Sequence, residues 1–289
     1  MTQELTASYV TLSGAGFAEP ARIPFAERCR AAAAAGFAGI GLHAGDYQLM
    51  RDAGQDDESV RTMLAACSLT LVETEFLSGW ATAAGWSGAQ SAAAVFGEMG
   101  AAFRPHHVTA GELTAARLDI DMAAARLGAV CQYLAPLGLR VAVEAFPWSG
   151  LKDVATARAV VERSGAPNAG LMIDVWHFYN SRSTLADLDG LAAAQIVAVQ
   201  LNDGRLVAED YLLEARRGRL LPGDGQLDVA GLVTGLHELG FRGPYCVEVN
   251  YPGYRDLTAD EMAVQAFAKA SAVLGSAPAH GGSADLEAT

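Results

Sequence analysis

Residues 170–178 read Gly170-Leu171-Met172-Ile173-Asp174-Val175-Trp176-His177-Phe178, so an apolar run leads directly into a carboxylate. Short runs rich in Val, Ile and Leu are typical of strands that are buried on both faces in a parallel sheet. Similar runs recur along the chain. The predicted strands are Ala7–Leu12, Gly39–His43, Thr70–Phe76, His107–Ala110, Leu139–Ala145, Ala169–Asp174, Ile196–Leu201 and Tyr245–Asn250.

Stretches with helical periodicity lie between these strands, and glycines that end a helix follow several of them, as at Gly36 and Gly165. Eight strands alternating with eight helices predict an α/β fold, the closed (β/α)₈ TIM barrel, which uses about 250 residues as one domain. The predicted helices are Pro24–Ala35, Asp57–Cys67, Ala89–Phe103, Ala115–Leu137, Val154–Ser164, Leu185–Ala194, Val229–Leu239 and Ala259–Leu274.

The ends of the chain and one competing topology complete the fold prediction. We expect a single barrel domain over residues 1–275 and a disordered tail over residues 276–289, which are rich in Ala, Gly and Ser. A doubly wound open sheet is the alternative, and it would carry a glycine-rich phosphate loop after the first strand. Ser13-Gly14-Ala15-Gly16 lies at that place but does not extend to GxGxxG, so the barrel is favoured.

The composition excludes several classes of protein. A formal net charge of −13 argues against a nucleic-acid partner, because phosphate binding needs clustered Lys and Arg. The sequence contains no run of about 20 apolar residues, so no membrane span is predicted, and the first residues do not resemble a signal peptide. The four cysteines are scattered without CxxC spacing, which is typical of free thiols in a reducing cytoplasm.

Oxygen-bearing side chains end four consecutive predicted strands, namely Glu144, Asp174, Gln200 and Glu248. Barrel enzymes carry their active sites at the carboxyl ends of the strands, so these side chains should meet there. Buried carboxylates repel one another unless a cation compensates them. An all-oxygen set predicts Mn²⁺ first, with Mg²⁺ and Co²⁺ as alternatives, and disfavours Zn²⁺ because it holds no imidazole or thiolate. The competing interpretation is that each acid is solvated or pairs with an arginine.

At these positions the sequence resembles the xylose isomerase-like TIM barrels of the sugar phosphate isomerase/epimerase group. The resemblance covers about residues 5–275 and is sharpest over Gly170–Phe178, with support from Val143–Pro147, Val199–Asp203, Leu221–Gly225 and Val247–Val249. It implies that Glu144, Asp174, Gln200 and Glu248 are the metal ligands. The third ligand is commonly His in this family, and Gln at that place resembles the hydroxypyruvate isomerase branch.

The resemblance also implies a reaction. In the family, two glutamates move a proton next to a substrate carbonyl while the metal stabilises the enediolate, which makes Glu144 and Glu248 the catalytic candidates. His177 and Arg219 match substrate-binding residues of the family. Trp176 and Glu75 are further candidates for the sugar pocket, although each could equally be rim packing. The alternative for His177 is a satisfied loop histidine beside Trp176. The expected partner is a small carbohydrate or keto-polyol, and family members are often homo-oligomers.

Several functions remain open from the sequence. The region after Glu144 lacks the further acid of the family's ketose 3-epimerases, which weakens that assignment. A lyase of the same superfamily, such as a keto-inositol or dehydroshikimate dehydratase or an enzyme that eliminates from 3-keto-glycosides, would begin with the same proton abstraction.

An apurinic endonuclease would need a histidine-rich metal cluster and a basic face. A non-catalytic binding protein would not need both Glu144 and Glu248. His106 and His107 begin a strand, at the end away from the expected site.

Overall fold

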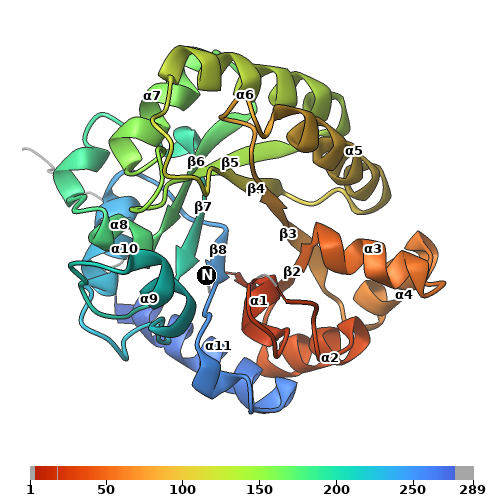
Figure 1. Cartoon of the computed structure of the whole chain (residues 1–289). Coiled ribbons are helices and arrows are strands. Elements are labelled where there is room, and N and C mark those ends of the chain that lie inside the picture. Colours follow the sequence, from red (N-terminus) through yellow and green to blue (C-terminus); the bar gives the residue numbers. More distant parts are fainter. Residues whose placement is uncertain (1–3, 18, 277–289) are drawn as a thin grey trace, which may run out of the picture.

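The computed structural model describes residues 4–17 and 19–276, and within them the strands form a closed parallel barrel (Figure 1). Each strand pairs with the next in sequence, and the first pairs with the last. The open-sheet alternative is therefore excluded and the TIM barrel is confirmed. The strands are β1 (Leu5–Ala7), β2 (Gly39–His43), β3 (Thr70–Leu77), β4 (His107–Gly111), β5 (Arg140–Glu144), β6 (Ala169–Asp174), β7 (Ile196–Leu201) and β8 (Tyr245–Val247).

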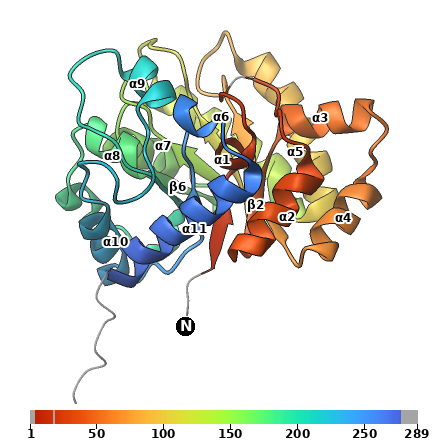
Figure 2. The ribbon, with the colours of Figure 1, turned by 90° about the horizontal axis from the view of Figure 1, so that it is seen from below.

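The longer helices form a ring around the barrel, and short helices lie on the loops that follow the strands (Figure 1). The ring consists of α2 (Phe25–Ala35), α4 (Asp57–Ala66), α5 (Trp86–Phe103), α6 (Ile120–Leu134), α7 (Val154–Ser164), α10 (Val229–Glu238) and α11 (Ala259–Ser276). The short helices are α1 (Tyr9–Leu12), α3 (Ala44–Asp52), α8 (Val175–Asn180) and α9 (Tyr211–Arg217). In Figure 2 the chain enters β1 from below and α9 lies at the upper edge, so the carboxyl ends of the strands face upward.

Two predicted elements are wrong. The predicted strand Ala7–Leu12 is β1 only up to Ala7, and Tyr9–Leu12 is the helical turn α1, because the chain leaves the sheet at Ser8. The predicted helix Leu185–Ala194 is two 3₁₀ turns, η2 (Leu185–Leu188) and η3 (Ala193–Gln195). Gly190 lies between them with a φ of 74°, which a continuing helix does not allow.

Local side chains set other boundaries. Asp119 caps α6 by accepting a hydrogen bond from the Met122 N–H, so the helix starts at Ile120 rather than at Ala115. Pro136 lies in the 3₁₀ turn η1 (Ala135–Leu137) that ends the same helix. Helix α11 runs to Ser276, and the rest of the predicted disordered tail lies outside the described residues. No helix in the described ranges is long and apolar enough to span a membrane.

On the side of β6 and β7, the polar side chains at the carboxyl ends lie above apolar residues. Met172 lies two residues before Asp174 on the same face of β6, and Ala198 lies two residues before Gln200 on the same face of β7. Met172 and Ala198 pack with Ala142 and Val197 in a small cluster apart from the main core. The polar side chains toward the carboxyl ends of β6 and β7 therefore stand on an apolar base.

Candidate active site

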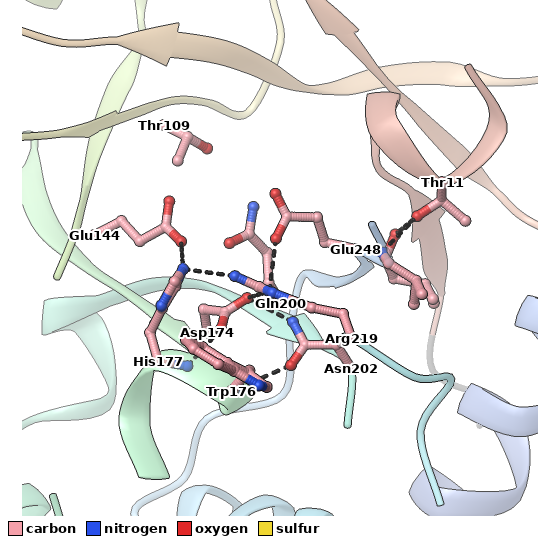
Figure 3. Close-up of polar contacts among 12 residues, drawn as sticks. Thr11, Thr109, Glu144, Asp174, Trp176, His177, Gln200, Asn202, Arg219 and Glu248 are labelled. Atoms are coloured by element: carbon pink, nitrogen blue, oxygen red, sulfur yellow. Dashed lines mark hydrogen bonds and ion pairs between the residues drawn. The ribbon is translucent and has the colours of Figure 1, made fainter. Parts of the chain in front are cut away.

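Glu144, Asp174, Gln200 and Glu248 are all buried at the carboxyl ends of β5 to β8. Asp174 lies beside Gln200 in the β6–β7 ladder, so their positions are fixed by backbone pairing. In Figure 3 the carboxylates of Glu144 and Glu248 point toward one another, with Gln200 between them. The barrel therefore gathers the four side chains that the sequence singled out, which come from widely separated parts of the chain.

Arg219 inserts its guanidinium into this group of acids. Its Nη1 lies 2.5 Å from Asp174 Oδ2 and 3.0 Å from Glu248 Oε2, and all three side chains are buried. Its Nη2 lies 2.5 Å from His177 Nε2 (Figure 3). The interpretation that an acid pairs with an arginine thus describes Asp174 and Glu248, but Glu144 has no ion pair with Arg219 among the described residues.

His177 joins the acids on the side of Glu144. Its Nε2 lies 3.5 Å from Glu144 Oε1. Ligand atoms of Glu144, Asp174 and His177 all lie within 4.8 Å of one another, so these three side chains could hold a metal ion. The sequence argument against Zn²⁺ assumed a site without an imidazole, and His177 removes that assumption.

The donor atoms fit a divalent cation. Gln200 Oε1 is buried and has no hydrogen-bond partner among the described residues, whereas Gln200 Nε2 donates to Glu73 Oε1 at 3.0 Å. An orphaned buried acceptor beside clustered carboxylates is the environment that a hard cation with oxygen ligands prefers. Arg219 supplies one positive charge to three acids, and a divalent ion would supply the remainder. The residues that could hold it are Glu144, Asp174, Gln200 and Glu248, with His177 in reach.

The acids of the site differ in proton affinity. Burial, together with the charges of Glu248 and Asp174, raises the pKa of Glu144 well above its ordinary value. Burial raises the pKa of Glu248 to about 8, although the charge of Arg219 opposes this. Burial also acts to raise the pKa of Asp174, but the charge of Arg219 and the hydrogen bonds from the His177 N–H and the Arg219 side chain outweigh it, and the net pKa is lowered. The two glutamates can therefore carry protons while Asp174 stays ionised.

The histidine is neutral under ordinary conditions. Burial and the charge of Arg219 lower the pKa of His177 to about 3, against the charge of Asp174. Phe146 and Trp148 pack against the ring, with centroids 4.6 and 5.2 Å away. A neutral imidazole in this place can donate or accept a hydrogen bond, or bind a metal.

Helix α8 begins at Asp174 and holds it in place. Asp174 Oδ1 accepts the His177 N–H at 2.8 Å, which makes the carboxylate the N-cap of the helix. Asp174 Oδ2 accepts the side-chain amide of Asn202 at 2.6 Å, and Asn202 Oδ1 accepts the Trp176 N–H at 2.8 Å. Asn202 was missed as a site residue, although it follows Gln200 by two positions at the same strand end.

Trp176 and Glu75 have different surroundings. Trp176 is fully buried, and its ring centroid lies 5.4 Å from the Arg219 guanidinium. The indole therefore stabilises the arginine through a cation–π contact. Glu75 is buried, and its Oε1 has no hydrogen-bond partner in the part of the chain that the structure describes. Burial and the charges of Glu73 and Glu248 raise the pKa of Glu75 well above its ordinary value, which favours its protonated form.

The loop that carries Arg219 is organised by Asp203. Asp203 Oδ1 accepts the N–H groups of Gly204 and Leu227 at 2.7 and 3.0 Å, and Oδ2 accepts those of Gly223 and Gly225 at 3.0 and 2.9 Å. The backbone of Asp203 also pairs with Leu220, directly after Arg219. Helix α9 lies within this loop. The loop is therefore pinned at both sides of the arginine.

The carboxyl ends of the strands, where Glu144, Asp174 and Glu248 lie, are called the barrel mouth below. A closed barrel with a polar site at this mouth is typical of the TIM-barrel class of enzymes. Residues 29–270 match the sequence profile of the xylose isomerase-like TIM barrels, and the chain belongs to that family. A segment of 121 residues is 34% identical to 3-dehydroshikimate dehydratase of Pseudomonas aeruginosa and covers 41% of this chain and 19% of that enzyme. A segment of 128 residues is 29% identical to inosose isomerase of Halalkalibacterium halodurans and covers 44% of this chain and 45% of that enzyme.

The matched segments thus span less than half the length of these curated relatives. One of these relatives is named as a dehydratase and the other as an isomerase. Among solved structures, an IOLI protein with a bound zinc atom matches with a TM-score of 0.84 and 17% identity, over 96% of this chain and 100% of that chain. This likeness supports the fold.

Proposed function

We propose that this chain is a divalent-metal-dependent enzyme that removes a proton next to the carbonyl of a small keto-sugar or keto-polyol and isomerises or epimerises it. The observation that carries the proposal is the pair Glu144 and Glu248, two buried carboxyls with raised pKa values that point toward one another across the site. One glutamate takes the proton from the carbon beside the carbonyl, and the other returns a proton.

The remaining side chains hold the substrate and the ion. The ligands that we propose are Glu144, Asp174, Gln200 and Glu248. When bound, the ion polarises the substrate carbonyl and so makes the neighbouring proton more acidic. Mn²⁺ remains our first candidate because the ligands are oxygens, and Zn²⁺ becomes an alternative because His177 lies within reach of Glu144 and Asp174.

His177 and Arg219 are the proposed substrate-binding residues. The neutral imidazole of His177 can donate to a substrate oxygen, and the guanidinium of Arg219 can hold a hydroxyl pair or an anionic group. The packing of Phe146 and Trp148 against the His177 ring fixes its orientation. Because these groups bind without taking part in proton transfer, their loss should affect substrate affinity as well as turnover.

A dehydratase is the second candidate, and the similarity to 3-dehydroshikimate dehydratase favours it. The first proton abstraction is the same, but a β-hydroxyl then leaves and one water is lost. The family resemblance includes enzymes of both kinds, so the two reactions must be separated by experiment.

The test uses the whole protein, freed of metal with a chelator and then supplied with Mn²⁺ or Zn²⁺. Keto-sugars, inososes, 3-keto-glycosides and 3-dehydroshikimate are incubated with it in D₂O and analysed by mass spectrometry. Deuterium in a product of otherwise unchanged composition identifies an isomerase, and loss of water or of an aglycone identifies a lyase. If the chelated protein is as active as the metal-loaded protein, the metal role is wrong.

A further inference from the structure

Gln200 differs from the other proposed ligands because an amide has two unlike ends. Its Oε1 accepts hydrogen bonds or binds a cation, whereas its Nε2 only donates. Gln200 is fully buried on β7, so water does not decide which end faces the acids. The neighbouring side chains must therefore determine the orientation of the amide.

Glu73, on β3, provides the acceptor that determines it. Gln200 Nε2 donates to Glu73 Oε1 at 3.0 Å, and within residues 4–17 and 19–276 no group hydrogen-bonds to Gln200 Oε1. Gln200 and Glu73 are separated by 127 positions in the sequence. Since the amide nitrogen is engaged by Glu73, the amide oxygen is left for the side where Glu144 and Glu248 converge (Figure 3).

Two side chains of β4, Thr109 and His107, contact the Glu73 carboxylate and hold it in place. The Thr109 hydroxyl, labelled in Figure 3, donates to Glu73 Oε1 at 3.2 Å, and His107 Nε2 lies 3.5 Å from the same oxygen. His107 Nδ1 is in turn within 3.2 Å of His106 Nδ1. All of Glu73, His107 and Thr109 are buried. His107 begins its strand away from the barrel mouth, as expected, but its ring supports the group below the site.

We infer that Glu73 is a positioning residue: it holds the amide of Gln200 so that Oε1 faces the metal proposed at Glu144, Asp174 and Glu248. The inference rests on the proposed function. A partner that orients a metal ligand typically changes metal affinity by about 10- to 100-fold when it is removed. Glutamine in place of Glu73 offers a donor as well as an acceptor, so the Gln200 amide can turn over and present Nε2.

The same cluster has a competing interpretation. Ligand atoms of Glu73, His107 and Cys246 lie within 4.8 Å of one another, so they could bind a second ion directly. Cys246 lies beside Gln200 in the β7–β8 ladder. Cys246→Ala therefore disturbs the same layer of the barrel and removes the thiol, but it leaves the hydrogen bond between Glu73 and Gln200 in place.

The experiment measures Mn²⁺ affinity and stoichiometry by isothermal titration calorimetry on the full chain, with thermal unfolding of each metal-free variant. We expect one ion in the unaltered protein, Mn²⁺ binding weaker by about 10- to 100-fold in Glu73→Gln, and unaltered affinity in Cys246→Ala. The double variant Glu73→Gln with Gln200→Glu should recover the affinity. In that variant the new amide at position 73 can donate to one oxygen of the new carboxylate at position 200, while the other oxygen faces the metal.

Each other outcome overturns the inference. Equal affinity in Glu73→Gln, or no recovery in the double variant, means that Glu73 does not act through the orientation of Gln200. Two ions in the unaltered protein and one in Cys246→Ala mean that the cluster is a metal site. No metal binding to the unaltered protein refutes the proposed function itself, and the positioning role with it.

Discussion

Two regions of this molecule compensate their buried acids in different ways. In the loop between β7 and α10, Asp203 accepts four backbone N–H groups, two on each oxygen. At the barrel mouth, the guanidinium of Arg219 pairs with Asp174 and Glu248 and acts on Glu144 only through its charge. The loop acid is fully satisfied by rigid donors, whereas the acids of the mouth exceed the cationic charge beside them.

The difference separates a structural acid from acids that need a ligand. A carboxylate surrounded by backbone donors holds a loop together and gains nothing from an added ion. Carboxylates buried in excess of cations raise one another's pKa or bind a metal, because isolated buried charge is costly. Variants of the two regions should therefore respond differently to metal and to pH, with the largest effects expected at the mouth.

The largest effect should follow from replacing either glutamate of the mouth. Glu144→Gln and Glu248→Gln keep the shape of the side chain but remove its proton transfer, so turnover should fall by about 10²- to 10⁴-fold or more. Turnover is measured with the substrate found in the D₂O assay, and circular dichroism checks the fold. Glu162→Gln, on the outer side of α7, is the control that should keep full activity. Full activity in both site variants would contradict the mechanism.

The same contrast explains what could be predicted from sequence. Glu144, Asp174, Gln200 and Glu248 are recognisable because each ends an apolar strand, and parallel strands bring their ends together. Three of the four donors to Asp203 lie 20 to 24 residues further along the chain, and no local sequence pattern predicts that they reach it.

Contacts across the barrel are hidden in the same way. The partner that Glu73 finds in Gln200 depends on β3 facing β7 after the barrel has closed. The sequence predicts a strand over Tyr9–Leu12 because a short apolar run does not distinguish a strand from a helical turn at the barrel mouth.

Removing the cation of the mouth should destabilise the metal-free protein strongly. Arg219→Met leaves Asp174 and Glu248 buried without their partner, which typically costs about 3–5 kcal/mol of unfolding free energy. Urea unfolding measures it. Arg205→Met is the matched control, because the Arg205–Glu214 pair on the same loop is largely exposed and should contribute less than about 1 kcal/mol. Saturating Mn²⁺ should reduce the deficit of Arg219→Met, since the ion supplies the missing charge. Equal losses in the two variants would refute the contrast.

Asp203→Asn should cost less, about 2–3 kcal/mol, and Mn²⁺ should not restore it. The new amide nitrogen would face two backbone N–H groups, either those of Gly223 and Gly225 or those of Gly204 and Leu227, and leave them unsatisfied. The backbone of Gly225 already lies so close that a Cβ there would collide with Asp203 Oδ1, which leaves little room for the loop to rearrange. The measurement is again urea unfolding with and without Mn²⁺. A loss that Mn²⁺ repairs would show that Asp203 belongs functionally to the metal site.

The smallest effect concerns pH. The pKa of Glu248 is raised to about 8 in the folded protein, so between its ordinary value of 4.5 and about 8 the native state binds a proton that the unfolded state does not. Stability of the metal-free protein should therefore fall as pH rises through this interval. The lowered pKa of His177, about 3, acts in the opposite direction, but only below its ordinary value of 6.5, because above it the unfolded histidine is neutral as well. Of these two residues, therefore, only Glu248 changes the stability of the metal-free protein between pH 7 and about pH 8.

Differential scanning calorimetry at pH 7 and at about pH 8 should accordingly show a fall in Tm of the metal-free protein. The fall should be smaller in Glu248→Gln, which lacks the titrating group, and smaller again with Mn²⁺ bound, because coordinated carboxylates stay ionised at both pH values. Asp203→Asn should keep the full slope, since its site lacks the excess of acids. A Tm that rises over this interval in the unaltered metal-free protein would mean that the mouth carries no surplus negative charge, and the distinction between the two regions would fail.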